Sequence, residues 1–219
     1  MQFAQKCAIM LPRKVVLWMI KNVVFDFGQV MIRFEPSYMV GKYVSDKEDA
    51  ALLEEVVFDR LYWDKLDAET ITDEEVVNAC LARLPERLHA CVPKIYYNWI
   101  YNIPEIEGMG ALVDDIKEAY GVRVFLLSNI STYFAEHAGE IPVLSKFEKC
   151  IFSSVCGCVK PDRKIFEHLC AACGIAAEET AFVDDNEKNI RGANDFGITG
   201  ILFDGDVNAL RHTLDKILG

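Results

Sequence analysis

The C-terminal half of this 219-residue chain alternates short apolar runs with longer amphipathic segments, and this alternation limits the possible folds more than any other feature. The apolar runs have the length and composition of buried strands, and the segments between them have the apolar spacing of helices. Strands that alternate with helices form β–α–β units, which predicts a parallel sheet flanked by helices. The predicted strands are Val122–Leu127, Cys150–Ser153, Thr180–Val183 and Thr199–Phe203. The predicted helices are Thr132–Gly139, Asp162–Cys173, Glu187–Phe196 and Val207–Leu218.

One further strand, Val23–Phe27, is separated from the others by a long stretch without strand-like runs. That stretch, residues 33–110, shows helical spacing instead, and Thr72 followed by Glu75 resembles a capping box at a helix start. Its predicted helices are Asp46–Phe58, Thr72–Leu84 and Val92–Ile100. We therefore predict an α/β fold: a Rossmann-like parallel sheet flanked by helices, with an inserted helical cap.

The predicted organisation has three parts. Residues 19–32 and 111–219 form the α/β core, and residues 33–110 form the cap. Residues 1–18 are an N-terminal extension of unassigned role, without the basic start or the small-residue cleavage site of a secretory signal.

Polar side chains stand where the predicted strands end. Asp26 ends the first strand, Ser128-Asn129 follow the second, and Asp184-Asp185 follow the fourth. Lys160-Pro161 come a few residues after the third strand. Each pair by itself could be a helix cap or a turn, but ligands of parallel sheets bind beyond the carboxyl ends of the strands. We therefore expect these residues to meet at one site.

The residue types at this edge suit phosphoryl transfer. Three carboxylates, those of Asp26, Asp184 and Asp185, would repel one another unless a hard cation lay among them, and Mg²⁺ binds carboxylates together with phosphate oxygens. Ser128 and Lys160 supply donors for a phosphoryl group. A carboxylate in line with the phosphorus can act as a nucleophile, which makes Asp26 the candidate for an aspartyl-phosphate intermediate.

Charge and hydropathy narrow the possible partners. The chain has 23 Lys and Arg against 34 Asp and Glu, a net charge of −11 that disfavours binding to nucleic acid or to an anionic membrane surface. A small phosphorylated metabolite remains compatible, because local cations can reverse the sign within one pocket. No apolar run is long enough to predict a membrane-spanning helix. The expected location is the cytoplasm.

The eight cysteines are expected to be reduced thiols, several of them on apolar helix faces. A zinc site built from Cys156, Cys158, Cys170 and Cys173 is the alternative to that prediction. The four histidines are scattered without the spacing of metal ligands, and surface or helix-end positions are expected for them.

Four short motifs resemble those of the haloacid dehalogenase (HAD) superfamily, and they occur in that family's order. They are VVFDFGQVMI, FLLSNIS, VKPD and FVDDNEKNI, which together with the segments between them cover residues 22 to about 204. The inserted helices resemble a C1-type cap. FDFGQV, LLSN, KPDRKIFEHL and FVDDNEKNIRGANDFGI are most similar to the subgroup that contains bacterial α-D-glucose-1-phosphate phosphatase.

The resemblance implies a role for each matching residue. Asp26 would be the nucleophile and a Mg²⁺ ligand, the carbonyl of Gly28 a second ligand, and Asp185 the main acidic ligand beside Asp184. Phe27, Gly28, Ser128 and Asn129 would bind the substrate's phosphoryl group. Lys160 would neutralise charge between nucleophile and phosphate. Asn189 stands where many relatives have another Asp, and we expect it to support the metal ligands without binding the metal itself.

Gly28 departs from the family pattern, because most phosphatases of the superfamily carry an Asp there as general acid and base. A positioned acid or base contributes about 10²–10⁴-fold to a rate. Two interpretations remain open. The chain is a phosphatase whose substrate needs less help or which uses another group or a water, or it is a non-catalytic protein that binds phosphometabolites. We favour the phosphatase, since the similar subgroup also carries Gly at this position. Dehalogenation is disfavoured, because that branch needs no metal and no Asp pair.

The cap is expected to choose the substrate, for which a sugar phosphate such as glucose 1-phosphate is the first candidate. Trp63 is expected to fill the core of the cap. The other candidate contacts are Arg33, Phe34, Tyr96, Tyr97 and Trp99.

Overall fold

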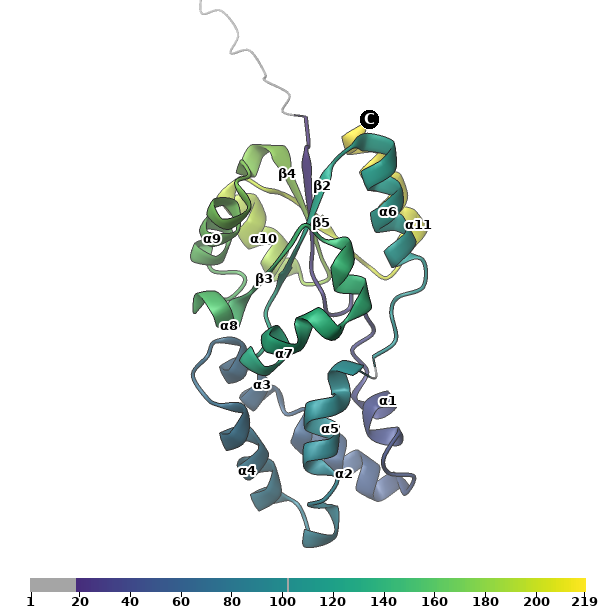
Figure 1. Ribbon diagram of the computed structural model, residues 1–219, viewed down its shortest axis with the longest axis vertical. Coiled ribbons are helices and arrows are strands. Elements are labelled where there is room, and N and C mark those ends of the chain that lie inside the picture. Colours follow the sequence, from purple (N-terminus) through teal and green to yellow (C-terminus); the bar gives the residue numbers. More distant parts are fainter. Residues whose placement is uncertain (1–18, 102) are drawn as a thin grey trace, which may run out of the picture.

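The structure is a computed structural model that describes residues 19–101 and 103–219, so the N-terminal extension at 1–18 lies outside the described residues. Its centre is a five-stranded parallel sheet with the strand order β3-β2-β1-β4-β5 (Figure 1). The strands are β1 (Asn22–Phe25), β2 (Arg123–Ser128), β3 (Lys149–Phe152), β4 (Thr180–Asp184) and β5 (Thr199–Leu202). This confirms the predicted α/β fold class, and each predicted strand overlaps an observed one.

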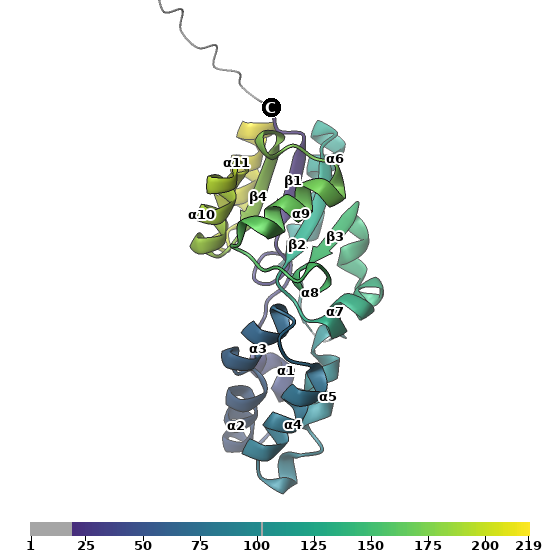
Figure 2. The same cartoon turned by 90° about the vertical axis from the view of Figure 1, so that its left-hand side faces the viewer.

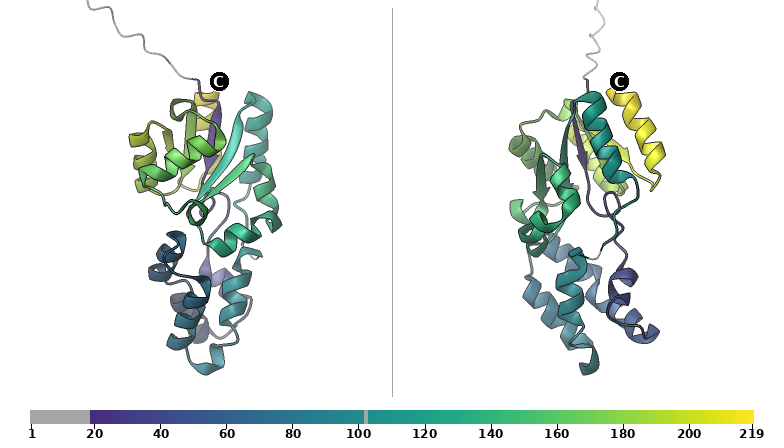
Figure 3. Two further views of the ribbon diagram at one scale, coloured as in Figure 1. Left: turned by 60° about the vertical axis from the view of Figure 1, so that its left-hand side comes forward. Right: turned by 45° about the vertical axis from the view of Figure 1, so that its right-hand side comes forward.

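Helices cover both faces of the sheet, because its central strands are apolar on both sides. Phe25 and Leu126 pack with α6 (Met109–Tyr120) and α11 (Val207–Leu218), which lie side by side on one face (Figure 3). Val24 and Phe125 point to the other face, where α9 (Arg163–Cys173) and α10 (Glu187–Phe196) pack. Alternate residues of a strand thus belong to two separate apolar clusters, as the period of two requires.

A helical segment follows β1 and lies beyond the carboxyl ends of the strands (Figure 2). The capping box predicted at its centre is present, since Thr72 Oγ1 accepts from Glu75 N and Glu75 Oε2 accepts from Thr72 N. Its elements are α1 (Pro36–Gly41), α2 (Lys47–Val57), α3 (Arg60–Asp67), α4 (Asp73–Arg83), η1 (Glu86–Leu88), α5 (Val92–Asn98) and η2 (Trp99–Tyr101). The sequence did not predict α1 and α3, which are only six and eight residues long, or α6 in the core.

Short elements complete the connections between strands. They are α7 (Thr132–His137), η3 (Ala138–Glu140), η4 (Pro142–Lys146), α8 (Ser153–Cys156) and η5 (Ala177–Glu179). In the part of the chain that the structure describes, no helix is long and apolar enough to cross a membrane.

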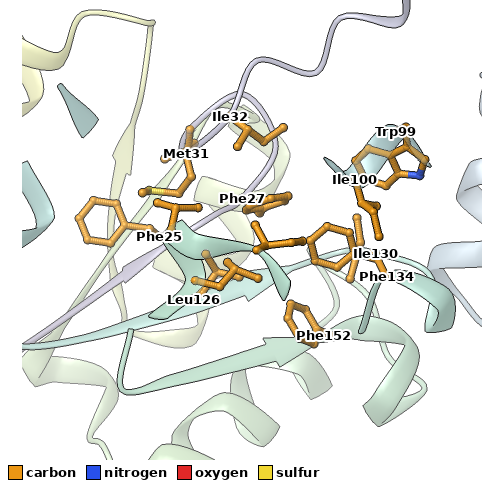
Figure 4. Packing of buried hydrophobic residues seen from close by; sticks show 14 of the residues in the cluster. Phe25, Phe27, Met31, Ile32, Trp99, Ile100, Leu126, Ile130, Phe134 and Phe152 are labelled. Atoms are coloured by element: carbon orange, nitrogen blue, oxygen red, sulfur yellow. The ribbon is translucent and has the colours of Figure 1, made fainter. Parts of the chain in front are cut away.

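Aromatic side chains join the helical segment to the sheet (Figure 4). Phe27, directly after β1, lies 5.0 Å from the ring of Phe134, which stacks on Trp99 of η2 at 5.6 Å. Trp99 in turn meets Phe34 edge to face at 5.4 Å. One apolar cluster therefore runs from the sheet into the helical segment, and this packing fixes the position of the helices over the strand ends.

Candidate functional site

The polar residues that follow the strands converge on one pocket of about 420 Å³ between the sheet and the helical segment. Asp26 follows β1, Ser128 ends β2, and Asp184 ends β4. The chain leaves β1 for β2 on one side and later adds β4 on the other, so the pocket lies at the switch in strand order. Such a switch point is where open parallel sheets bind their ligands.

Lys160, in the loop between α8 and α9, is the cation at the centre of this pocket. Its Nζ lies 2.7 Å from Asp26 Oδ1 and 2.7 Å from Asp184 Oδ2, and it also donates to the carbonyl of Leu127 at 3.1 Å. The Lys160 side chain is only 2% exposed. A buried ammonium group needs such partners, because leaving it unpaired away from water is costly.

Asn129 fixes the backbone of Lys160. Its Oδ1 accepts from Lys160 N at 2.8 Å, and its Nδ2 donates to Lys160 O at 3.0 Å. The side chain predicted to bind phosphate is therefore engaged on both sides with the lysine loop. Neighbouring Ser128 is buried, and its hydroxyl makes only a long contact of 3.5 Å to the carbonyl of Asn129, which leaves it available to a ligand.

Asp184 is held by a network of donors. Its Oδ1 accepts from Asn186 N at 2.8 Å, and Asn189 Nδ2 lies 3.1 and 3.0 Å from the two carboxylate oxygens. Asn189 thus touches a carboxylate of the site, and its supporting role toward a metal stays a prediction. Asp184 is fully buried, so these bonds together with Lys160 are what stabilise its charge.

Asp26, Asp184 and Asp185 form a group of carboxylates that fits a divalent cation. One oxygen of each lies within 4.8 Å of the others, and no other group of three or more such ligands occurs in residues 19–101 and 103–219. Among residues 19–101 and 103–219, Lys160 is the only buried cation in contact with this group, so three carboxylates share one ammonium group. Oxygen ligands at this spacing, with Asp185 exposed to solvent, match the way Mg²⁺ is bound by a few carboxylates and water.

Burial shifts the ionisation of these groups. Desolvation raises the pKa of Asp26 above its ordinary value, although Lys160 acts in the opposite direction. Desolvation and the charge of Asp184 likewise raise the pKa of Asp185. Burial alone would lower the pKa of Lys160, but the two carboxylates beside it raise it. One ammonium group thus does not neutralise the three carboxylates, and a divalent cation would supply the missing positive charge.

The loop after Asp26 leaves space where a side chain is absent. A Cβ on Gly28 would have no heavy atom within 4 Å, and Gly28 is half-buried at the pocket. The N–H of Phe27 donates to Asp26 Oδ1 at 2.7 Å and orients that carboxylate.

Three of the six residues proposed to contact substrate line the pocket, and three do not. Phe34, Trp63 and Trp99 line it. Trp63 is also a core residue, as expected, since it is buried and donates from Nε1 to the carbonyl of Val57 at 2.9 Å. Arg33, Tyr96 and Tyr97 lie outside the pocket.

The pocket also has walls that the sequence did not indicate, from α3 and the turn before it. Phe58, Arg60, Asp64 and Asp67 come from this region, and Lys188 from α10. No motif marks α3, because its eight residues are too few to define a helical period. In the structure, α3 packs against α8 near the sheet edge.

An α/β fold with polar side chains at the switch in strand order is typical of a ligand-binding or catalytic site, and a carboxylate at such a site can act as a nucleophile. The family model of haloacid dehalogenase-like hydrolases matches residues 20–197. The chain belongs to this family of hydrolases.

Solved structures share the fold. A HAD-like family hydrolase from Porphyromonas gingivalis is 24% identical, with 90% of this chain and 98% of that chain covered and a TM-score of 0.65. A HAD family enzyme from Bacteroides thetaiotaomicron, in complex with magnesium and inorganic phosphate, is 19% identical, with 87% and 98% covered and a TM-score of 0.63.

Two curated relatives come from fungi. A drimenol cyclase from Aspergillus calidoustus is 23% identical over 84% of this chain, and a sesquiterpene phosphatase from Aspergillus oryzae is 30% identical over 42% of it. The matches span 34% and 47% of the lengths of these two relatives.

Proposed function

We propose that this hydrolase is a Mg²⁺-dependent phosphatase of small phosphomonoesters that uses Asp26 as its nucleophile. The observation that carries the proposal is the position of Lys160, 2.7 Å from both Asp26 and Asp184, with Asp185 in the same carboxylate group. The solved relative with bound magnesium and phosphate supports the choice of ion and ligand. The cation would be held by Asp26, Asp184, Asp185 and the carbonyl of Gly28, and it would offset charge on the phosphoryl oxygens.

The residues of the chain would divide the work as follows. Asp26 attacks the phosphorus, oriented by the N–H of Phe27. Ser128 donates its free hydroxyl to a phosphoryl oxygen, and Lys160 stabilises the charge that develops between nucleophile and phosphate. Asn129 holds Lys160 in place through its backbone. Water then releases phosphate from the aspartyl-phosphate.

Two substrate classes suit the pocket. The motif resemblance favours a sugar phosphate such as glucose 1-phosphate, with the helical segment as a cap over the site. The walls favour an apolar phosphomonoester, because Ile32, Phe34, Phe58, Trp63, Trp99 and Ile130 line the pocket beside the phosphate end. The relative named as a sesquiterpene phosphatase supports the second class. Aromatic rings can stack on a sugar or enclose an isoprenoid chain.

A non-catalytic protein that binds phosphometabolites is the alternative function, and Gly28 is the observation that favours it. Such a protein would retain the cation and phosphate contacts and lack turnover. Dehalogenation fits the site less well, since three carboxylates in one group would serve no purpose without a metal.

Phosphate release separates these functions. The panel contains glucose 1-phosphate, hexose 6-phosphates, acetyl phosphate, farnesyl phosphate and p-nitrophenyl phosphate, each with Mg²⁺ or EDTA. We expect turnover that disappears with EDTA and in Asp26→Asn. The preferred substrate distinguishes the sugar class from the apolar class. A folded protein that binds Mg²⁺ and phosphate but releases none would establish the binding function instead.

A further inference from the structure

Asp67, the last residue of α3, is the one carboxylate in the pocket walls whose placement is unexplained by the site described above. Its Oδ1 is buried and has no hydrogen-bond partner among the described residues. Asp67 lines the same pocket as Asp26, but it comes from the helical segment and not from the sheet. Figure 2 shows α3 directly beyond the carboxyl ends of the strands.

The lack of a partner is unusual for a buried carboxylate oxygen, although Asp67 as a residue is half-buried. Asp184 has Lys160, Asn186 and Asn189 around it, and Asp59 at the other end of α3 accepts from Arg83 and Leu61. An unpaired buried carboxylate oxygen costs free energy, and such groups are retained where a ligand or a reaction uses them. Asp67 as a residue is half-buried and lines the substrate pocket, so its carboxyl group borders the space that a ligand would occupy.

Gly28 stands where the usual general acid is missing, and the space for that side chain is open. A phosphatase with an alcohol leaving group needs a proton donor in its first step and a proton acceptor in its second. The pocket walls contain few candidates. The carboxylates of Asp26, Asp184 and Asp185 belong to the cation group, and Asp64 is paired with Arg60 and 62% exposed.

We propose that Asp67 is the general acid and base of this site, in the role left open by Gly28. The inference rests on the proposed phosphatase function. In the first step, Asp26 forms a bond to phosphorus while the bond to the leaving oxygen breaks, and that oxygen takes the proton of the Asp67 carboxyl group. In the second step, the oxygen of a water molecule attacks phosphorus and the bond between phosphorus and Asp26 breaks. The Asp67 carboxylate takes the proton that this water loses. Phosphate and the free Asp26 carboxylate result, and Asp67 is protonated again.

The environment of Asp67 suits both steps. Burial raises the pKa of Asp67 to about 7, so the carboxyl group exchanges its proton near neutral pH. Arg60 and Lys160 act against this shift, and Asp64 adds to it. Its position at the C-terminal end of α3 also favours the neutral form, because the helix dipole is negative there. The other charged groups that line the pocket are Asp26, Asp185 and Lys188.

The test compares Asp67→Asn with wild type on substrates that differ in leaving group. With the best alkyl or sugar phosphate, we expect kcat to fall by about 10²–10⁴-fold. With p-nitrophenyl phosphate, whose leaving group needs no proton, we expect a rapid burst of one equivalent of nitrophenol followed by slow turnover. In the pH profile of kcat, the fall in rate at high pH that reports loss of the Asp67 proton should disappear in Asp67→Asn. Adding Gly28→Asp to the variant should restore at least tenfold of the lost rate.

Glu69→Gln is the matched control, since it removes a carboxylate two residues further along that lies outside this pocket. Thermal unfolding of each variant verifies that the fold is intact. Three results would overturn the inference alone: wild-type rates in Asp67→Asn, an equal loss on all leaving groups without a burst, or no rescue by Gly28→Asp. A wild-type protein that turns over none of the substrates would overturn the proposed function and this inference together.

Discussion

The ammonium group of Lys160 lies 2.7 Å from Oδ1 of Asp26, and both side chains are almost entirely buried. Lys160 belongs to the loop between α8 and α9, and Asp26 follows the first strand, so the pair joins the two halves of the site across the sheet edge. Because Lys160 also contacts Asp184, one cation offsets two buried anions. The stability of the fold therefore depends on the same residues to which we assign the proposed chemistry.

Removing the positive charge of Lys160 should therefore lower the free energy of unfolding. Lys160→Met leaves Asp26 and Asp184 buried without a cation, and we expect a loss of about 3–5 kcal/mol in the free energy of unfolding. Added Mg²⁺ should restore part of it. Lys21→Met, which removes a solvent-exposed ion pair with Glu179, should cost at most about 1 kcal/mol. Urea unfolding with and without Mg²⁺ measures both, and equal losses in the two variants would contradict the prediction.

Metal binding should be visible without turnover. Mg²⁺ at 100 times its dissociation constant would stabilise the folded state by about 2.7 kcal/mol, read as a higher Tm. Asp185→Asn should abolish this shift, because it removes a proposed ligand, and should leave the metal-free Tm equal or higher, because repulsion from Asp184 is relieved. Glu187→Gln, an exposed acid in the next helix, serves as the control. A full Mg²⁺ shift in Asp185→Asn would exclude Asp185 as a ligand.

The pH dependence of stability should report Asp67. Burial raises the pKa of Asp67 from 3.8 to about 7, so the folded state holds this proton more tightly than the unfolded state. The stabilisation that comes from this more tightly held proton is complete below pH 4 and is lost as the pH rises toward 7. At about 1.4 kcal/mol per pKa unit, the loss reaches at most about 4 kcal/mol. Asp67→Asn lacks this titration, so the difference in unfolding free energy between variant and wild type should grow in the variant's favour from pH 4 to pH 7. A constant difference would contradict it.

Gly192 controls how closely α10 approaches the lysine loop. A Cβ there would lie 2.7 Å from the carbonyl oxygen of Pro161, a backbone atom that cannot rotate away. We expect Gly192→Ala to destabilise the fold by about 1–3 kcal/mol and to lower phosphatase activity by displacing Lys160. Gly139→Ala meets no atom within 4 Å and is the control. Denaturant unfolding together with phosphate release checks the prediction, which fails if the two variants behave alike.

The strands and the longer helices of the core could be predicted because their signals are local. The boundaries of α10 and α11 agree with the predicted segments, since each has a polar cap residue before it and glycine after its last residue. The short helices α1 and α3 were not predicted, although Asp59 caps α3. Within α3, eight residues contain too few apolar positions to define a period, so Asp67 could not be singled out before the fold placed it.

Distances between the sequence-predicted site residues needed the tertiary structure. Asp26 and Lys160 are far apart along the chain, and the strand order β3-β2-β1 brings the loop after β3 and α8 to the end of β1, where the two side chains meet. The pairing of Asn129 with the backbone of Lys160, and the absence of Tyr96 from the pocket, were equally invisible in the sequence.

The sequence alone determined the fold class, the family motifs and the residue types at the strand ends, because hydrophobic periodicity and strand-end chemistry are written in neighbouring residues. The tertiary structure decided which of these groups form ion pairs, which aromatic rings line the pocket and which carboxylate oxygen is left without a partner. Those properties depend on side chains brought together from distant segments, where burial removes water and strengthens every interaction between charges.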